Sequence, residues 1–136
     1  MNNIDVSKEI MAKTMFGEAR GEYRKYGINS IIAIGSVIMN RVAKSGKSIE
    51  DICLKPLQFS CWNESDPNRS IIDNISENDE VYTICLDAAE GVISQKIEDV
   101  TNGADHYYST KLKPPPTWSY YGNVTAFIGN HVFLKI

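Results

Sequence analysis

The chain has 136 residues, of which 43% are hydrophobic and 23% are charged, a balance typical of globular proteins and not of disordered or membrane-embedded ones. One domain of this length buries a core without disulfides or metal ions and leaves no room for a second domain, so we predict a single monomeric domain over residues 1–136. The net charge is −3 and no basic run exceeds two residues, which excludes nucleic acid as a partner because its non-specific binding needs a concentrated basic face.

The first residues lack the basic cluster and the apolar run of a secretory signal. No segment approaches the roughly 18 consecutive apolar residues of a membrane-spanning helix. We therefore expect synthesis in the cytoplasm and no membrane insertion.

Apolar periodicity predicts a first helix over residues 7–20, with Ser7 as its N-cap and Gly21 as its stop. Ile10 and Met15 belong to its buried face, which follows the i, i+4 spacing of one helical side. Glu18 lies on that same face. A carboxylate on an apolar stripe is unusual and marks this position as a candidate for chemistry.

A second helix is expected over residues 28–43, with apolar residues on nearly every side, which is typical of a central helix. A short helical turn at 48–52 and a long loop over 57–75 should follow. The next helix is expected to begin after Ser76 as its N-cap and to reach about Val92. Short strands are expected at 105–109 and 131–135. The fold class is thus mainly α (α+β), with a small β or irregular part.

Glu18 is the first candidate for catalysis, because a desolvated carboxyl group suits general-acid work near neutral pH. A structural ion pair with Arg20 or Arg41 is the alternative. Glu22 lies one helical turn later, but acid and nucleophile of a retaining glycosidase flank the scissile bond from opposite faces. Two carboxylates on one helix approach a sugar from the same side, so we expect Glu22 to orient Arg20 or a backbone amide instead.

Other chemistries have weaker support. Cys61 with His106 or His131 as base has the chain order of a cysteine amidase or endopeptidase. The histidines and cysteines show no metal-binding spacing, so no metal and no cofactor is expected. A binding module without catalysis is a third possibility.

Aromatic residues concentrate in segments that read as loops or strand ends, and asparagines are interleaved with them. Half of these rings are expected to fill the core, while the others suit a carbohydrate-binding cleft, where flat rings meet sugar faces. The aromatic residues in these segments, taken together, are Trp62, Tyr107, Tyr108, Trp118, Tyr120 and Tyr121.

Five segments, in this order, resemble the SleB-type cell-wall hydrolases, a family that includes spore-cortex-lytic enzymes and phage endolysins. The segments are 15–22, 38–42, 58–60, 101–104 with 107–108, and 128–133. The resemblance covers nearly the whole chain, from about residue 10 to residue 133.

The resemblance implies a lysozyme-like, lytic-transglycosylase-like domain that acts on peptidoglycan glycan strands. Such an enzyme cleaves the β-1,4 bond between N-acetylmuramic acid and N-acetylglucosamine, with Glu18 as catalytic acid and base, and leaves a 1,6-anhydro product. The family positions that line the cleft correspond to Gln58, Ser60, Tyr107 and Tyr108. We add Trp118 as a substrate-binding residue, and the supporting residues expected around Glu18 are Glu22, Arg20 and Asn40.

The chain differs from the spore members of the family, since it shows neither their export signal nor their separate peptidoglycan-binding repeat. This difference favours a phage-type endolysin that reaches the wall after release, through a holin-type pore or on lysis. A hydrolytic lysozyme, or a Cys61–histidine amidase or endopeptidase of the cell wall, remains the alternative activity.

Overall fold

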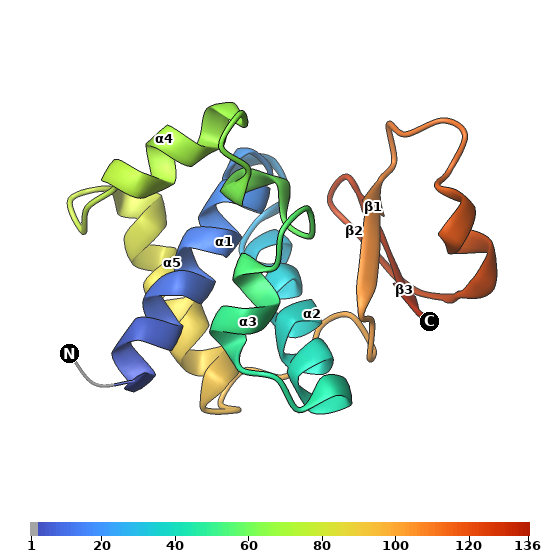
Figure 1. Ribbon diagram of the computed structural model, residues 1–136, viewed down its shortest axis with the longest axis horizontal. Helices are drawn as coiled ribbons and strands as arrows, with labels where there is room; N and C mark the ends of the chain where they lie inside the picture. The colour runs from blue at the N-terminus through green and yellow to red at the C-terminus, as the bar shows by residue number, and fades with distance from the viewer. Residues whose placement is uncertain (1–2) are drawn as a thin grey trace.

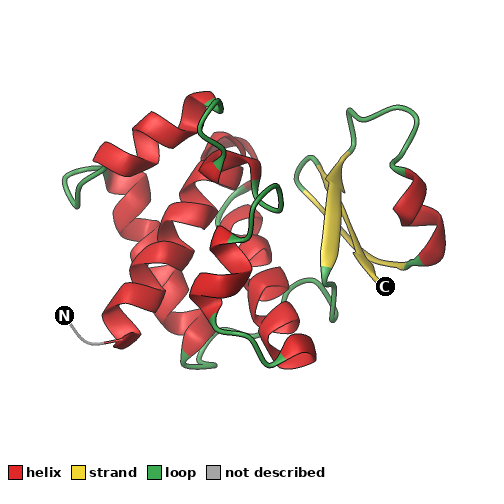
Figure 2. Cartoon of the chain, viewed as in Figure 1, coloured by secondary structure: helices red, strands yellow, loops and turns green. Residues whose placement is uncertain are grey.

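Residues 3–136 are described by a computed structural model, with side chains from residue 6 onward. The helices gather into one body and a small sheet lies beside it (Figures 1 and 2). The mainly α fold with a minor β part is therefore confirmed. Within this range the elements are α1 (Asn3–Tyr26), α2 (Asn29–Ser45), α3 (Ile49–Leu54), η1 (Ser60–Trp62, a 3₁₀ helix), α4 (Pro67–Asn74), α5 (Glu80–Ile93), β1 (His106–Ser109), η2 (Thr117–Tyr121, a 3₁₀ helix), β2 (Asn123–Ile128) and β3 (His131–Lys135).

Helix α1 is longer than its sequence predicts at both ends: it begins at Asn3, so Ser7 lies inside it and is not its N-cap, and it continues through Gly21 to Tyr26. A glycine inside a helix costs only about 1 kcal/mol, and the buried Glu22, which directly follows Gly21, makes tertiary contacts that hold the helix together. The actual stop is Gly27, which has a φ of +86° and donates its N–H to the Tyr23 carbonyl at 2.8 Å. This is the left-handed glycine ending that many helices use.

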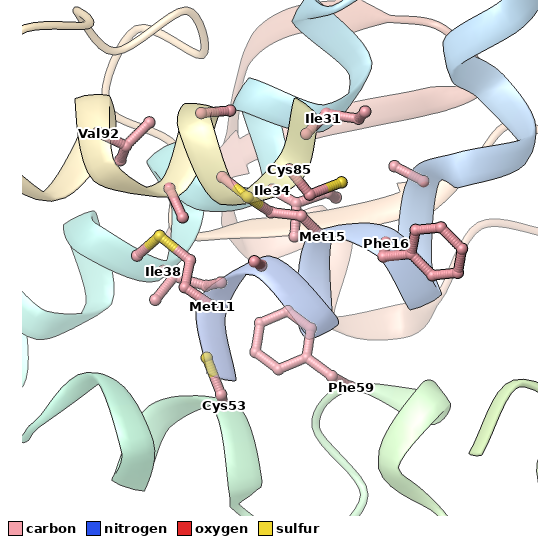
Figure 3. Close-up of a cluster of buried hydrophobic side chains, with 14 of the residues drawn as sticks. Met11, Met15, Phe16, Ile31, Ile34, Ile38, Cys53, Phe59, Cys85 and Val92 are labelled. Carbon is pink, nitrogen blue, oxygen red and sulfur yellow. The ribbon is translucent and has the colours of Figure 1, made fainter. Parts of the chain in front are cut away.

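The main core lies between α1, α2 and α5 (Figure 3). Met11, Met15 and Phe16 enter it from α1, and the side chains around them come from the other helices and from Phe59, which directly precedes η1. Every residue of α2 from Ser30 to Ile38 is buried, which confirms that α2 is the central helix. No helix within residues 3–136 is both long and apolar enough to span a membrane.

The sequence predicts a long loop over residues 57–75. The structure instead has two helical elements in this segment, η1 and α4. Asp66 is the N-cap of helix α4, because its side chain accepts a hydrogen bond from the Asn68 N–H at 2.8 Å, and Pro67 lies in the first turn. An Asp–Pro pair is a typical helix start. The helix was missed because it is only eight residues long and has one buried side chain, Ile72.

Helix α5 begins later than expected. Asp79 is the N-cap, because its carboxylate accepts a hydrogen bond from the Tyr82 N–H at 3.0 Å. Ser76 instead hydrogen-bonds the Asn78 N–H in the preceding turn. Both residue types cap helices well, so the choice between them depends on where the apolar face of α5 meets the core.

The sheet is antiparallel in the order β1-β3-β2, and β2 was not predicted. It was missed because it is an edge strand with exposed apolar side chains such as Phe127, which is 75% exposed, so its hydrophobic pattern marks no buried face. Central strand β3 packs on α2, where Phe133 meets Ala33 and Val37 in a second buried cluster. This contact sets the position of β1 relative to the helices.

Candidate active site

The Glu18 carboxylate receives three hydrogen bonds from two other elements. The Tyr107 hydroxyl of β1 donates to Oε1 at 2.6 Å. The Cys61 backbone N–H and the Ser60 hydroxyl of η1 donate to Oε2 at 3.2 and 3.3 Å. Glu18 is half-buried, so its carboxylate is held in a defined orientation and still reaches the surface.

The close approach of η1 to α1 depends on Gly17. A Cβ atom at Gly17 would lie 2.5 Å from Cys61 Cβ and 2.7 Å from its Sγ, distances at which atoms clash. Trp62 holds the same contact from the other end of η1, since its Nε1–H donates to the buried Thr14 hydroxyl at 2.9 Å. The glycine before Glu18 therefore brings the Cys61 N–H within reach of the carboxylate.

Arg69 of α4 fixes the outer side of Trp62. Its guanidinium donates to the Trp62 carbonyl at 2.7 Å and lies 5.8 Å from the centre of the indole ring. The Asp73 carboxylate accepts a further hydrogen bond from Arg69 Nε at 3.0 Å. Helix α4, absent from the sequence prediction, thus supports the segment that holds Glu18.

Tyr107 is placed by its ring contacts. It pairs with Phe133 across β1 and β3, and its ring centre lies 5.5 Å from that of Phe133 and 4.9 Å from that of His131. Burial, together with the neighbouring Glu18 carboxylate, raises the pKa of Tyr107 well above its usual range. The hydroxyl therefore keeps its proton and acts as a donor to Glu18.

Glu22 links α1 to the turn between β2 and β3. Its Oε1 accepts the Asn130 N–H at 2.7 Å and its Oε2 lies 3.0 Å from His131 Nδ1. Burial raises the pKa of Glu22, but the contacts with His131 and Asn130 outweigh burial and lower it overall. A Cβ at Gly129 would lie 2.4 Å from Glu22 Oε1. Of the two partners expected for Glu22, the structure shows the backbone amide.

The supporting residues Arg20 and Asn40 lie in different places. Arg20 stacks on the Phe16 ring at 5.1 Å, and no hydrogen-bond partner for its buried Nη1 is found among the described side chains. Within residues 6–136, neither Arg20 nor Arg41 forms an ion pair with Glu18, so the structural ion pair considered above is not found. Asn40 donates its side-chain N–H to the Ala104 carbonyl at 2.8 Å, which ties α2 to the segment leading into β1.

Asp99 organises that segment and was not singled out from the sequence. Its carboxylate accepts the N–H groups of Thr101 and Gly103 at 2.7 and 2.8 Å, and also the Asn40 side chain at 3.0 Å. Burial raises the pKa of Asp99, but the hydrogen bond from the Thr101 hydroxyl, followed by those from Asn40 and the two backbone N–H groups, lowers it overall. An Asp two residues before a Thr and four before a Gly is the sequence signal for such a turn.

The remaining substrate-binding candidates do not gather around Glu18. Side chains alternate along a strand, so Tyr108 and His106 leave the sheet on the face opposite Tyr107. The Trp118 ring lies 6.1 Å from that of Tyr108 and 5.2 Å from that of His106. Gln58 is exposed and lines a separate pocket. The structure thus brings only Ser60 and Tyr107 of this set onto Glu18.

Cys61 does not form a nucleophile–base pair. Burial, and next the Glu18 carboxylate, raise the pKa of its thiol. The histidine ring nitrogens face carboxylates instead, since His106 Nδ1 lies 2.9 Å from Asp105 and His131 contacts Glu22. Within the described residues, no group of three or more His, Cys, Asp or Glu is arranged to hold a metal ion.

Comparisons with known proteins show the family and the fold of the chain. Residues 27–134 match the family model described as Cell Wall Hydrolase. The catalytic domain of the germination-specific lytic transglycosylase SleB from Bacillus anthracis has a TM-score of 0.70 and 21% identity, over 99% of this chain and 97% of that one. The catalytic domain of SleB from Bacillus cereus has a TM-score of 0.69 and 22% identity, over 99% and 92%. No curated protein sequence matches the chain significantly.

These likenesses confirm the lysozyme-like fold expected from the sequence. The family match begins at residue 27, so Glu18 and Glu22 lie before the segment that it covers. The assignment of a role to Glu18 therefore depends on the geometry around it.

Proposed function

The chain belongs to the Cell Wall Hydrolase family, and we propose that it is a lytic transglycosylase of peptidoglycan, with Glu18 as its acid and base. The substrate bond is the β-1,4 linkage between N-acetylmuramic acid and N-acetylglucosamine. The observation that carries the proposal is one oriented carboxylate, on which Tyr107, Ser60 and the Cys61 N–H converge.

Among the described residues, Glu22 is the carboxylate one helical turn from Glu18, and its engagement favours transglycosylation over hydrolysis by a retaining mechanism. That mechanism needs a second carboxylate on the opposite face of the sugar. Glu22 is 8% exposed, and its two oxygens are engaged by Asn130 and His131. A lytic transglycosylase needs no second carboxylate, because the substrate supplies the nucleophile.

The reaction has two proton transfers at one group. Protonated Glu18 first donates its proton to the glycosidic oxygen as the bond from that oxygen to C1 of the muramic residue breaks, through an oxocarbenium-like state. The carboxylate then removes the proton of the C6 hydroxyl while O6 bonds to C1. The products are a 1,6-anhydromuramic end and a free N-acetylglucosamine 4-hydroxyl, no water is consumed, and Glu18 is protonated again.

The three donors have a definite task in this cycle. Between the two transfers Glu18 is a carboxylate, and hydrogen bonds to a charged group are stronger than those to a neutral one. Tyr107, Ser60 and the Cys61 N–H stabilise that carboxylate and aim its oxygens. One of the two similar solved structures supports the choice of reaction, because that protein is described as a lytic transglycosylase.

Mass spectrometry of the soluble fragments from digested sacculi tests the proposal. We expect anhydromuropeptides, which are one water lighter than hydrolysis products. Fragments with reducing ends alone would show a hydrolytic lysozyme instead, and new amino termini would show an amidase or endopeptidase. No observation in the structure favours the amidase, because Cys61 is buried and no described histidine is bonded to it.

The substitution Glu18→Gln tests the residue. It keeps the shape of the side chain and removes the proton that catalysis needs, so we expect a fall in turnover of about 10²-fold or more. Glu9→Gln, on the same helix and partly buried, is the matched control and should retain activity. A Glu18→Gln variant that is fully active and folded would overturn the role of Glu18.

The phage-type endolysin role stays a prediction from the sequence. Expression of the chain in a bacterial host, with and without a pore-forming holin, tests it. Lysis that requires the holin supports the endolysin role, and lysis at the same time without it contradicts the need for a pore.

A further inference from the structure

A pocket of about 390 Å³ lies beside the candidate active site, between the end of α2, helix α3 and the start of β1. Four cationic side chains line it: Arg41, Lys44, Lys47 and Lys55. The chain as a whole has a net charge of −3. This concentration of positive charge is therefore local and does not follow from the overall composition.

One of the two acidic residues in the pocket is neutralised from within. Asp105 is 3% exposed, and its carboxylate binds Lys44 Nζ at 3.0 Å and His106 Nδ1 at 2.9 Å. Lys44 also donates to the carbonyl of Ile136 at 2.7 Å. Lys44 and Asp105 thus neutralise each other's charge. The remaining charged residues that line the pocket are one acid, Asp51, and three cations.

Those three cations, Arg41, Lys47 and Lys55, have N–H groups that are not used in hydrogen bonds among the described residues. Arg41 Nε donates to the Asp105 carbonyl at 2.7 Å, and within residues 6–136 no acceptor is recorded for its terminal guanidinium nitrogens. The same holds in that range for the ammonium groups of Lys47 and Lys55, both exposed. A guanidinium with its terminal N–H groups free is the side chain best suited to bind a carboxylate in two-point fashion.

Two aromatic rings lie between Arg41 of the pocket and Glu18 of the active site. The Arg41 guanidinium lies 5.1 Å from the centre of the Phe59 ring. That ring is 6.5 Å from the ring of Tyr107, whose hydroxyl binds Glu18. Gln58, which precedes Phe59, lines the pocket itself. A substrate bound at Glu18 therefore has a positively charged pocket next to it.

We propose that this pocket binds a carboxylate of the peptide carried by the muramic acid residue, beside the bond that is cleaved. The inference rests on the proposed function. The N-acetylated sugars of the glycan strand carry no charge, and the negatively charged groups of this substrate are the carboxylates of its peptides. The pocket would thus make the enzyme prefer peptide-bearing strands to bare glycan.

Two soluble substrates test this: glycan strands free of teichoic acid that carry their peptides, and the same strands stripped of peptides by an amidase. The quantity measured is the ratio of the two kcat/KM values for anhydro-product release. We expect the wild-type ratio to favour peptide-bearing strands, and Lys47→Gln/Lys55→Gln to lower it about tenfold, since each exposed charge contact contributes modestly. Lys25→Gln/Lys96→Gln removes two exposed lysines elsewhere and should leave the ratio as in the wild type.

A direct binding measurement tests the pocket independently of catalysis. Titration of the wild type with a soluble muramyl peptide, followed by NMR, should shift the signals of the residues around Lys47 and Lys55. The same peptide with amidated carboxylates should not. Binding without cleavage of either strand would overturn the proposed function and keep the pocket. A ratio unchanged in Lys47→Gln/Lys55→Gln, with wild-type cleavage intact, or equal binding of the amidated peptide, would overturn the pocket.

Discussion

The hydroxyl of Tyr107 donates a 2.6 Å hydrogen bond to the Glu18 carboxylate, across 89 positions of the sequence. This length is in the range of strong hydrogen bonds from a hydroxyl to an ionised oxygen. The bond also joins the sheet to the helical body, because Tyr107 belongs to β1 and Glu18 to α1. The orientation of the proposed acid therefore depends on how the sheet packs against α2.

Tyr107→Phe tests that bond. The ring contacts with Phe133 and His131 remain, while Oε1 of Glu18 loses its donor. A hydrogen bond to a charged group contributes about 1.5–3 kcal/mol, so we expect kcat/KM to fall by about 10- to 100-fold with little loss of thermal stability. Anhydromuropeptide release and thermal unfolding measure the two effects. A variant as active as the wild type would show that the other donors are sufficient.

Two glycines of α1 should respond in opposite ways to alanine. Gly17→Ala places a methyl group against Cys61, and such overpacking costs about 1–3 kcal/mol. It should also slow catalysis, since η1 must move away from Glu18. At Gly21 an added Cβ meets nothing within 4 Å, so Gly21→Ala should stabilise the helix by about 0.5–1 kcal/mol. Urea unfolding of both variants decides this, and equal effects would contradict the close approach of η1.

Asp105 should contribute to stability in a pH-dependent way. Burial raises its pKa, but His106, the Ile136 N–H and Lys44 together lower it to about 2. Because the folded-state pKa lies below the unfolded value of about 3.9, the stabilisation is present above pH 4 and is lost as the pH falls from about 4 to about 2. The linked free energy is on the order of 2 kcal/mol.

Asp105→Asn removes this linkage. The wild type should exceed the variant in unfolding free energy by a constant amount between pH 5 and 7, and the difference should shrink below pH 4. Urea unfolding at a series of pH values measures it. Parallel curves down to pH 2 would mean that Asp105 titrates alike in the folded and unfolded states.

Cys61→Ala tests the role of nucleophile that the sequence analysis considers for this residue. The substitution removes the thiol and keeps the backbone N–H that binds Glu18. We expect most of the activity on sacculi to remain, with a loss of stability of about 1 kcal/mol or more from the small cavity. Complete loss of activity in a folded variant would restore the cysteine amidase as an explanation.

Local features of the fold were predicted well where neighbouring residues determine them. The burial of α2 follows from apolar residues on all of its sides, and β1 and β3 lie almost where expected. The errors occurred where a distant contact outweighs local preference. Helix α1 passes Gly21 because Glu22, one residue on, binds Asn130, which is 108 positions away.

The residues of the candidate active site also divide into those that the sequence predicted and those that only the structure revealed. Glu18 stood out as a carboxylate on a helical face, and the family resemblance pointed to Ser60 and Tyr107, which both bind it. The resemblance also pointed to Tyr108, which the pleat of β1 turns to the opposite face. The Cys61 N–H was not predictable, since every residue but proline has a backbone N–H and only the clearance at Gly17 brings this one to Glu18.

The sequence by itself determined the helical character of the chain, its central helix and the carboxylate on which the proposed chemistry depends. These features rest on periodicity and capping, which involve residues within a few positions of one another. Tertiary structure alone decided the partners of that carboxylate, the engagement of Glu22 and the basic pocket around Arg41. Each of these joins segments tens of residues apart, and such contacts form only when helices and sheet pack against one another.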